Sequence, residues 1–154
     1  MLRSLACGLL LALFAAPALA EQIVVESPWI RAAPPSARML AGYAVLHNRG
    51  EAERALVGAS STRFGLVEIH ETVEVDGIAR MREVPRLSIP AGESTSLEPG
   101  GRHLMLMRPT SVPAEGEQVE IVLRFDDGSE QPVAFEVRRE AVGSDEGHDH
   151  HHDH

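Results

Sequence analysis

The chain has 154 residues, a formal net charge of −9 with histidine neutral, and one cysteine. Clustered basic charge is what binds nucleic acid and anionic membrane surfaces, so this acidic balance argues against both as partners. A length of about 100 to 150 residues suits one folded domain, and we expect a single domain here.

Residues 1–20 have the pattern of a cleaved secretory signal peptide. Arg3 gives a basic start, an apolar run extends through Phe14, and residues 18–20 form a small-residue exit. The run is too short to span a bilayer, and no later stretch is long and apolar enough to do so. We therefore expect export of a chain that begins at Glu21, without membrane insertion after cleavage.

Cys7 is the only cysteine, and it lies inside this predicted signal peptide. A lipid anchor at Cys7 is the alternative, but a lipid-attachment cysteine should follow the apolar run, whereas Cys7 precedes most of it. The exported chain is thus expected to have neither thiol nor disulfide, so its stability must come from a packed core.

Residues 21–140 show short alternating apolar and polar runs broken by Gly, Pro and Asp, which predict an all-β domain. Strands are expected at residues 23–27, 42–48, 55–60, 66–75, 78–84, 94–97, 103–107, 118–125 and 131–137. Segments 28–40 and 87–101 contain prolines and are expected to be irregular connections. In the second segment, only the expected short strand at residues 94–97 is regular. That number of strands in one domain favours a sandwich or a barrel.

The Asp-Gly pair at residues 76–77 predicts a two-residue hairpin turn. Such a turn fixes the register and places Thr72 opposite Met81. His70 lies two residues from Thr72 on the same face, so His70 and Met81 become diagonal neighbours, about 7 to 8 Å apart at the backbone. An imidazole and a thioether at that separation can point toward one ion.

His103, Met105 and Met107 are spaced by two, so they share one face of an extended segment. Leu104 and Leu106 then face the core. Exposed methionines in a row have no packing reason, so the row predicts a ligand face. Alone, a methionine is usually a core filler and a histidine an ordinary polar group. Together, imidazole and thioether form the donor set that Cu(I) prefers.

Three further residues stay outside the predicted ligand set. His47 is expected to be a strand-end residue, and Met39 is a candidate for a supporting contact. Met107 is either a fifth ligand or a hydrophobic wall of the site, and the wall is favoured because methionine is a common apolar filler.

Residues 141–154 are predicted to form a disordered, metal-binding tail, because they contain almost nothing that could enter a core. Its histidines are His148, His150, His151, His152 and His154. Asp149 and Asp153 interrupt them, which favours a native tail over a purification tag. Imidazole and carboxylate donors suit Cu(II), so we expect the tail to capture Cu(II), with zinc and nickel as open alternatives.

The spacing His70-x10-Met81-x21-His103-x-Met105 resembles that of the PCu(A)C-type periplasmic copper chaperones. The resemblance extends over about residues 23–137 and includes the stretches 29–35, 56–61 and 101–107. It implies a cupredoxin-like Greek-key β-sandwich in the periplasm that binds one Cu(I) at an exposed site. The ligands carried over are His70, Met81, His103 and Met105.

One departure from the family pattern is Glu71, where many relatives have a methionine after the first histidine. In a strand this neighbour points to the other face, so we do not expect the site to be lost.

The resemblance further implies delivery of copper to the CuA centre of cytochrome c oxidase subunit II, or to a copper assembly factor. Enzymatic activity is not expected. A blue-copper centre needs a cysteine thiolate, and the folded domain has few histidines for a catalytic copper site. The alternatives are a periplasmic copper sequestration or resistance protein, and a β-sandwich interaction module with a metal-scavenging tail.

Overall fold

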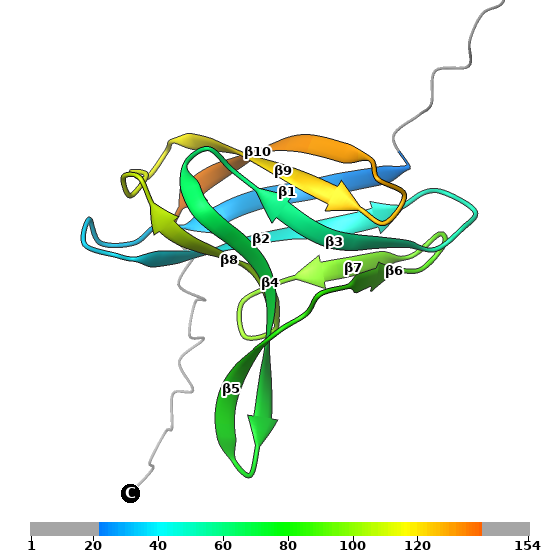
Figure 1. Cartoon of the computed structure of the whole chain (residues 1–154), viewed down its shortest axis with the longest axis horizontal. Coiled ribbons are helices and arrows are strands. Elements are labelled where there is room, and N and C mark those ends of the chain that lie inside the picture. The colour runs from blue at the N-terminus through cyan, green and yellow to red at the C-terminus, as the bar shows by residue number, and fades with distance from the viewer. Residues whose placement is uncertain (1–21, 140–154) are drawn as a thin grey trace, which may run out of the picture.

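The computed structural model describes residues 22–139 and is all-β in this range, as predicted (Figure 1). Its strands are β1 (Ile23–Arg31), β2 (Met39–Asn48), β3 (Arg54–Ser60), β4 (Phe64–Val75), β5 (Ile78–Glu83), β6 (Leu87–Ile89), β7 (Ser94–Leu97), β8 (Arg102–Pro109), β9 (Gln118–Phe125) and β10 (Glu130–Arg138). The predicted signal peptide, with Cys7, and the predicted tail lie outside the described residues. Within residues 22–139, no helix has the length and apolar character needed to cross a membrane.

The hydrogen-bonded strands follow the order β5-β4-β8-β2-β1-β10-β9-β3-β6, and β7 pairs with β2 beside this path. β1 and β10 are parallel, and the other pairs are antiparallel. The path curls around one hydrophobic core, to which every strand except β5 contributes a buried side chain (Figure 1). Among the side chains fully removed from water are Ile30, Leu46, Leu104 and Phe135.

Strand β1 continues through Trp29–Arg31, although an irregular connection was expected from residue 28 onward. A register shift separates Glu26 from Trp29, and Ser27 has a φ of 50°. This β-bulge accommodates Pro28, which has no N–H to donate to a ladder. The proline therefore marks a bulge inside the strand, and the expected strand end at residue 27 is wrong.

Strand β6 was also not expected, since residues 87–101 were predicted to be irregular outside residues 94–97. Leu87 and Ile89 are buried and pair with β3. A strand of three residues is too short for an alternating pattern to stand out in the sequence.

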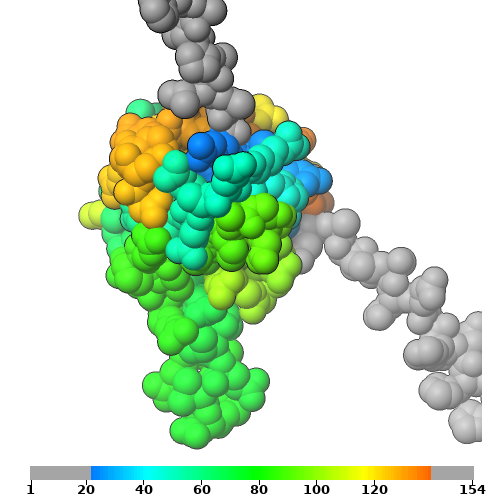
Figure 2. Space-filling model, turned by 90° about the vertical axis from the view of Figure 1, so that its right-hand side faces the viewer, coloured from blue at the N-terminus to red at the C-terminus, as the bar shows by residue number. Residues whose placement is uncertain are grey.

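Strands β4 and β5 form the predicted hairpin, which projects from the sandwich (Figures 1 and 2). Asp76 and Gly77 have φ values of 52° and 76°, as a type I′ turn requires. Thr72 lies opposite Met81, which confirms the predicted register. All of β5 is exposed, so its position depends on the pairing of β4 rather than on the core.

Candidate metal centre

Three neighbouring strands carry the predicted ligands on one face of the sheet. His70 on β4 lies directly opposite His103 on β8, with ring centres 6.1 Å apart and planes inclined by 49°. Met105 follows His103 by two residues, and Met81 on β5 lies diagonal to His70. Because alternate residues of a strand share a face, the structure brings these four side chains to one region.

A pocket of about 310 Å³ lies over this face, and Met81, His103 and Met105 line it. His70 is not among the lining residues. The rest of the wall comes mainly from β1, β2 and the segment between them, and consists of Arg31, Ala32, Ala33, Met39, Leu40, Ala41, Tyr43, Thr72 and Gly100. Three of the four predicted ligands thus share one pocket, and the fourth lies beside it, next to His103.

His103 is only 5% exposed. Its Nδ1–H donates a hydrogen bond to the carbonyl oxygen of Gly101, at 3.2 Å, which leaves the lone pair on Nε2. Burial lowers the pKa of His103, the bond to Gly101 opposes this, and the charges of His70 and Arg31 lower it further. The neutral imidazole, which is the form that ligates a metal, is therefore favoured.

His70 has the complementary arrangement. Its Nε2–H donates to the carboxylate of Glu68 at 2.9 Å, so the lone pair of the neutral imidazole lies on Nδ1. This Nδ1 is buried and has no hydrogen-bond partner among residues 22–139. A buried polar atom without a partner is costly, and a metal ion would satisfy it. An ion about 2 Å from one nitrogen of each ring fits the separation of the two imidazoles.

The two methionine ligands differ in exposure. Met105 is 7% exposed and Met81 is 59% exposed. The expectation of an exposed methionine row on β8 is wrong, because Met105 is buried and Met107 is half-buried. β8 is a central strand between β4 and β2, and side chains on the same face of these neighbours cover it. Met105 thus lies deep in the site, while Met81 lies at its surface.

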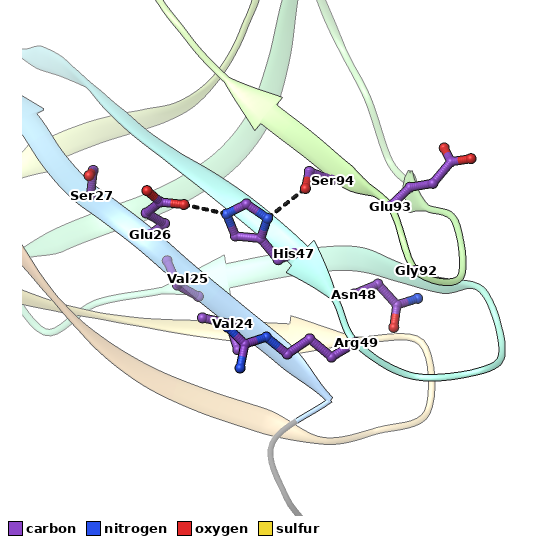
Figure 3. Close-up of a pocket in the computed structure, with 10 residues that line it drawn as sticks. All are labelled: Val24, Val25, Glu26, Ser27, His47, Asn48, Arg49, Gly92, Glu93 and Ser94. Atoms are coloured by element: carbon purple, nitrogen blue, oxygen red, sulfur yellow. Dashed lines mark hydrogen bonds and ion pairs between the residues drawn. The ribbon is translucent and has the colours of Figure 1, made fainter.

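The structure also locates the residues that were left outside the ligand set. Met39 is 56% exposed and lines the pocket, whereas Met107 pairs with Met39 and does not line it. His47 is the penultimate residue of β2, as expected of a strand-end residue. It lies between Glu26 and Ser94 in a separate hollow of about 810 Å³ that contains none of the predicted ligands (Figure 3).

Three residues near the site escaped the sequence interpretation. Glu68 could have been found, because it precedes His70 by two residues and so shares its face. Arg31 and Tyr43 could not, because they come from β1 and β2, and no local pattern predicts that these strands close the pocket. The Arg31 guanidinium lies 5.5 Å from the centre of the Tyr43 ring, which in turn lies 4.7 Å from the ring of Trp29.

The donor set itself has a chemical preference. Among residues 22–139, no group of three or more His, Cys, Asp and Glu side chains is placed to hold a metal ion. The pocket instead combines imidazole nitrogen with thioether sulfur. Soft thioethers select Cu(I), whereas carboxylate-rich sites suit hard cations such as Mg²⁺ and Ca²⁺. The residues present therefore fit a monovalent copper ion.

Comparisons with known proteins show the family and the fold of this chain. The LpqE-like family of candidate lipoproteins matches residues 23–137. The candidate lipoprotein Lxx21020 of Leifsonia xyli subsp. xyli is 36% identical over 120 residues, which are 77% of this chain and 71% of that protein.

Two solved structures share the fold. The solution structure of Cu(I)-bound DR1885 from Deinococcus radiodurans is 35% identical with a TM-score of 0.64, over 80% of this chain and 83% of that one. The copper-bound PCuAC domain from PmoF2 is 21% identical with a TM-score of 0.65, over 77% and 94% of the two chains. The resemblance to PCu(A)C-type proteins is thus confirmed. The chain belongs to the LpqE-like family and has the cupredoxin-like β-sandwich fold of the PCuAC domains.

Proposed function

We propose that this protein is a periplasmic copper chaperone that binds one Cu(I) through His70, Met81, His103 and Met105. The observation that carries the proposal is the pair of neighbouring imidazoles, on residues opposite each other in β4 and β8, with a buried, unpaired Nδ1 on His70. The two thioethers beside this pair supply the remaining donors. DR1885, whose Cu(I)-bound structure shares this fold, supports the assignment of the ion.

The donor set explains how such a site can both hold and release copper. Thioether and neutral imidazole carry no charge, so they bind Cu(I) without neutralising it. A partner that offers thiolates gains a charge interaction as well as softer ligands, and the ion can move to it. A His2Met2 site is therefore suited to reversible binding.

The position of Met81 favours transfer over sequestration. It is 59% exposed on a hairpin that projects from the sandwich, whereas His103 and Met105 are buried (Figure 1). An incoming ligand can displace Met81 first while the three deeper donors still hold the ion. We infer that the acceptor approaches from the hairpin side and presents thiolates, as the CuA centre of cytochrome c oxidase subunit II or a copper assembly factor would.

Delivery to such an acceptor requires export, which we propose on the basis of residues 1–20. The lipoprotein descriptions of the family and of Lxx21020 fit an exported protein. We further propose that the histidines of residues 141–154 capture Cu(II), while the folded pocket retains Cu(I). Imidazole with carboxylate suits the divalent ion, and imidazole with thioether suits the monovalent one.

An anaerobic Cu(I) competition titration against a chromophoric chelator tests the pocket. The five tail histidines are replaced by alanine in every sample, so that only the folded domain is measured. Wild-type pocket residues should bind one Cu(I) tightly, and the His70→Ala plus Met105→Ala variant should lose this binding. His47→Ala is the matched control, because His47 lies on the same sheet in a separate hollow.

Tight one-to-one binding that persists in the double variant would contradict the proposed ligands. An absence of tight binding to the folded domain would leave the tail as the metal site and would contradict the chaperone itself. Transfer is tested separately, by mixing the Cu(I)-loaded protein with a soluble CuA domain in its reduced, thiol form. Retention of copper by the loaded protein would favour sequestration.

A further inference from the structure

We propose that Arg31 sets the preference of the pocket for monovalent over divalent copper, by holding a fixed positive charge beside an uncharged set of ligands. This inference rests on the proposed function, since it concerns the same pocket. It assigns a specificity-determining role to a residue that donates no ligand atom.

Packing holds Arg31 at the pocket. It is the last residue of β1, and it lines the pocket together with His103 and Met105. Its guanidinium lies 5.5 Å from the centre of the Tyr43 ring, and Tyr43 is only 4% exposed. Tyr43 packs in turn against Trp29, 4.7 Å away between ring centres. The cation–π contact and this packing restrict where the guanidinium can lie.

The charge of Arg31 acts inside the site. Arg31 lines the same pocket as His103 and Met105, two of the proposed ligands. A copper ion held by these ligands would be repelled by that charge. The charge is also permanent, since a guanidinium does not lose its proton in proteins.

This repulsion discriminates between oxidation states because Coulomb energy is proportional to the charge of the ion. With uncharged ligands, a divalent ion in the pocket is repelled twice as strongly as a monovalent ion at the same place. Arg31 should therefore weaken Cu(I) binding moderately, which assists release, and weaken Cu(II) binding more. It should also raise the reduction potential of the bound copper.

The hairpin supplies a matched control. Arg80 lies next to Met81 on β5, is exposed, and does not line the pocket. Its charge is surrounded by water, where effective interactions are weak and screened by salt. Removal of the Arg80 charge changes the net charge of the protein by the same amount as removal of the Arg31 charge.

The experiment compares wild type, Arg31→Gln, Arg31→Met, Arg31→Lys and Arg80→Gln, all with the tail histidines replaced by alanine. Cu(I) and Cu(II) affinities are measured by competition with chelators for each state, and the midpoint potential of the bound copper is measured independently. Loss of the Arg31 charge should raise Cu(I) affinity roughly tenfold and Cu(II) affinity roughly a hundredfold, since the effect scales with ionic charge. The midpoint potential should fall accordingly, while Arg31→Lys and Arg80→Gln should stay near wild type.

A structural role for Arg31 would give a different pattern. Equal changes in the two affinities, weaker binding of both ions, or an Arg31→Lys variant that behaves like Arg31→Gln would overturn the inference. Arg31→Met repeats the charge removal with a long apolar side chain, so agreement between the two neutral variants excludes a local packing effect. If the wild-type pocket binds no Cu(I), the proposed function fails and this inference fails with it.

Discussion

At the scale of single residues, each of the two histidines has one ring nitrogen held by an oxygen atom of the protein. Gly101 fixes Nδ1 of His103, and Glu68 fixes Nε2 of His70. The two rings therefore use different nitrogens for these hydrogen bonds. Such outer partners set the tautomer, hold the ring orientation and raise the basicity of the ligating atom.

Glu68 should accordingly matter to copper binding although it is not a ligand. Replacement by alanine should lower Cu(I) affinity by about 10- to 100-fold, the range typical of lost outer partners of metal-bound histidines. Glu68→Gln keeps an oxygen that accepts the His70 N–H and should lose less. Competition titration of both variants checks this, and wild-type affinity in Glu68→Ala would show that Glu68 does not position His70.

The relative positions of the four proposed ligands could be predicted from the sequence because they follow local rules. The period of two on a strand aligned His103 with Met105, and a two-residue turn placed Met81 near His70. Burial was mispredicted, since whether β8 is central or at an edge depends on strands distant in sequence. The position of Arg31 at the pocket could not be predicted for the same reason, because it depends on the pairing of β1 with β2.

At the scale of elements, strand β5 of the β4–β5 hairpin carries one of the proposed ligands but contributes no core side chain. Exchanging two neighbours, Met81→Arg with Arg82→Met, moves the thioether to the other face of β5 at constant composition. Cu(I) affinity should fall as far as it does in Met81→Ala. The thermal midpoint should change by no more than a few degrees, because β5 buries no core side chain.

Chelator competition and thermal unfolding monitored by circular dichroism together check this exchange. Undiminished Cu(I) affinity in the exchanged protein would show that Met81 is not a ligand, or that the register of the hairpin differs in solution.

Asp126, the residue after β9, contacts β3 and the residue that precedes β6. It accepts a hydrogen bond from the Ala55 N–H at 3.1 Å and pairs with Arg86 at 2.9 Å. The bond from Ala55 and the nearby Arg86 lower the pKa of Asp126 below its ordinary value. The ionised form is thus favoured in the folded state, and this contribution to stability is lost as the pH falls through the lowered folded pKa.

Asp126→Asn should therefore be less stable than wild type at pH 7, with a difference that shrinks as the pH falls below the ordinary aspartate pKa of about 3.9. Urea unfolding of the copper-free proteins at pH 7 and in acid measures both differences. A difference that stays constant across this range would mean that the charge of Asp126 does not contribute.

The elements as a whole were largely predictable, and the errors have local causes. Alternation identified most strands, whereas Pro28 concealed the continuation of β1 because a bulge and a strand end look alike in sequence. The three residues of β6 were too few to show a period. The order of strands in the sheet depends on long-range pairing that periodicity does not encode.

At the scale of the whole molecule, two parts of the chain have separate proposed metal functions, Cu(I) binding in the folded pocket and Cu(II) capture by the tail. Deletion of residues 143–154 should lower Cu(II) uptake while leaving Cu(I) affinity nearly unchanged, since the thioethers belong to the folded pocket. Parallel titrations of the full and shortened proteins with each ion check this. Equal loss of both ions on deletion would contradict the division.

X-ray absorption at the copper edge, on the protein loaded anaerobically with one equivalent of Cu(I), identifies the atoms bound to the copper. We expect two sulfur and two imidazole nitrogen scatterers, with both sulfurs lost in the Met81→Ala plus Met105→Ala variant. A shell of nitrogen or oxygen alone in the wild-type protein would place the copper outside the pocket and contradict the His2Met2 site.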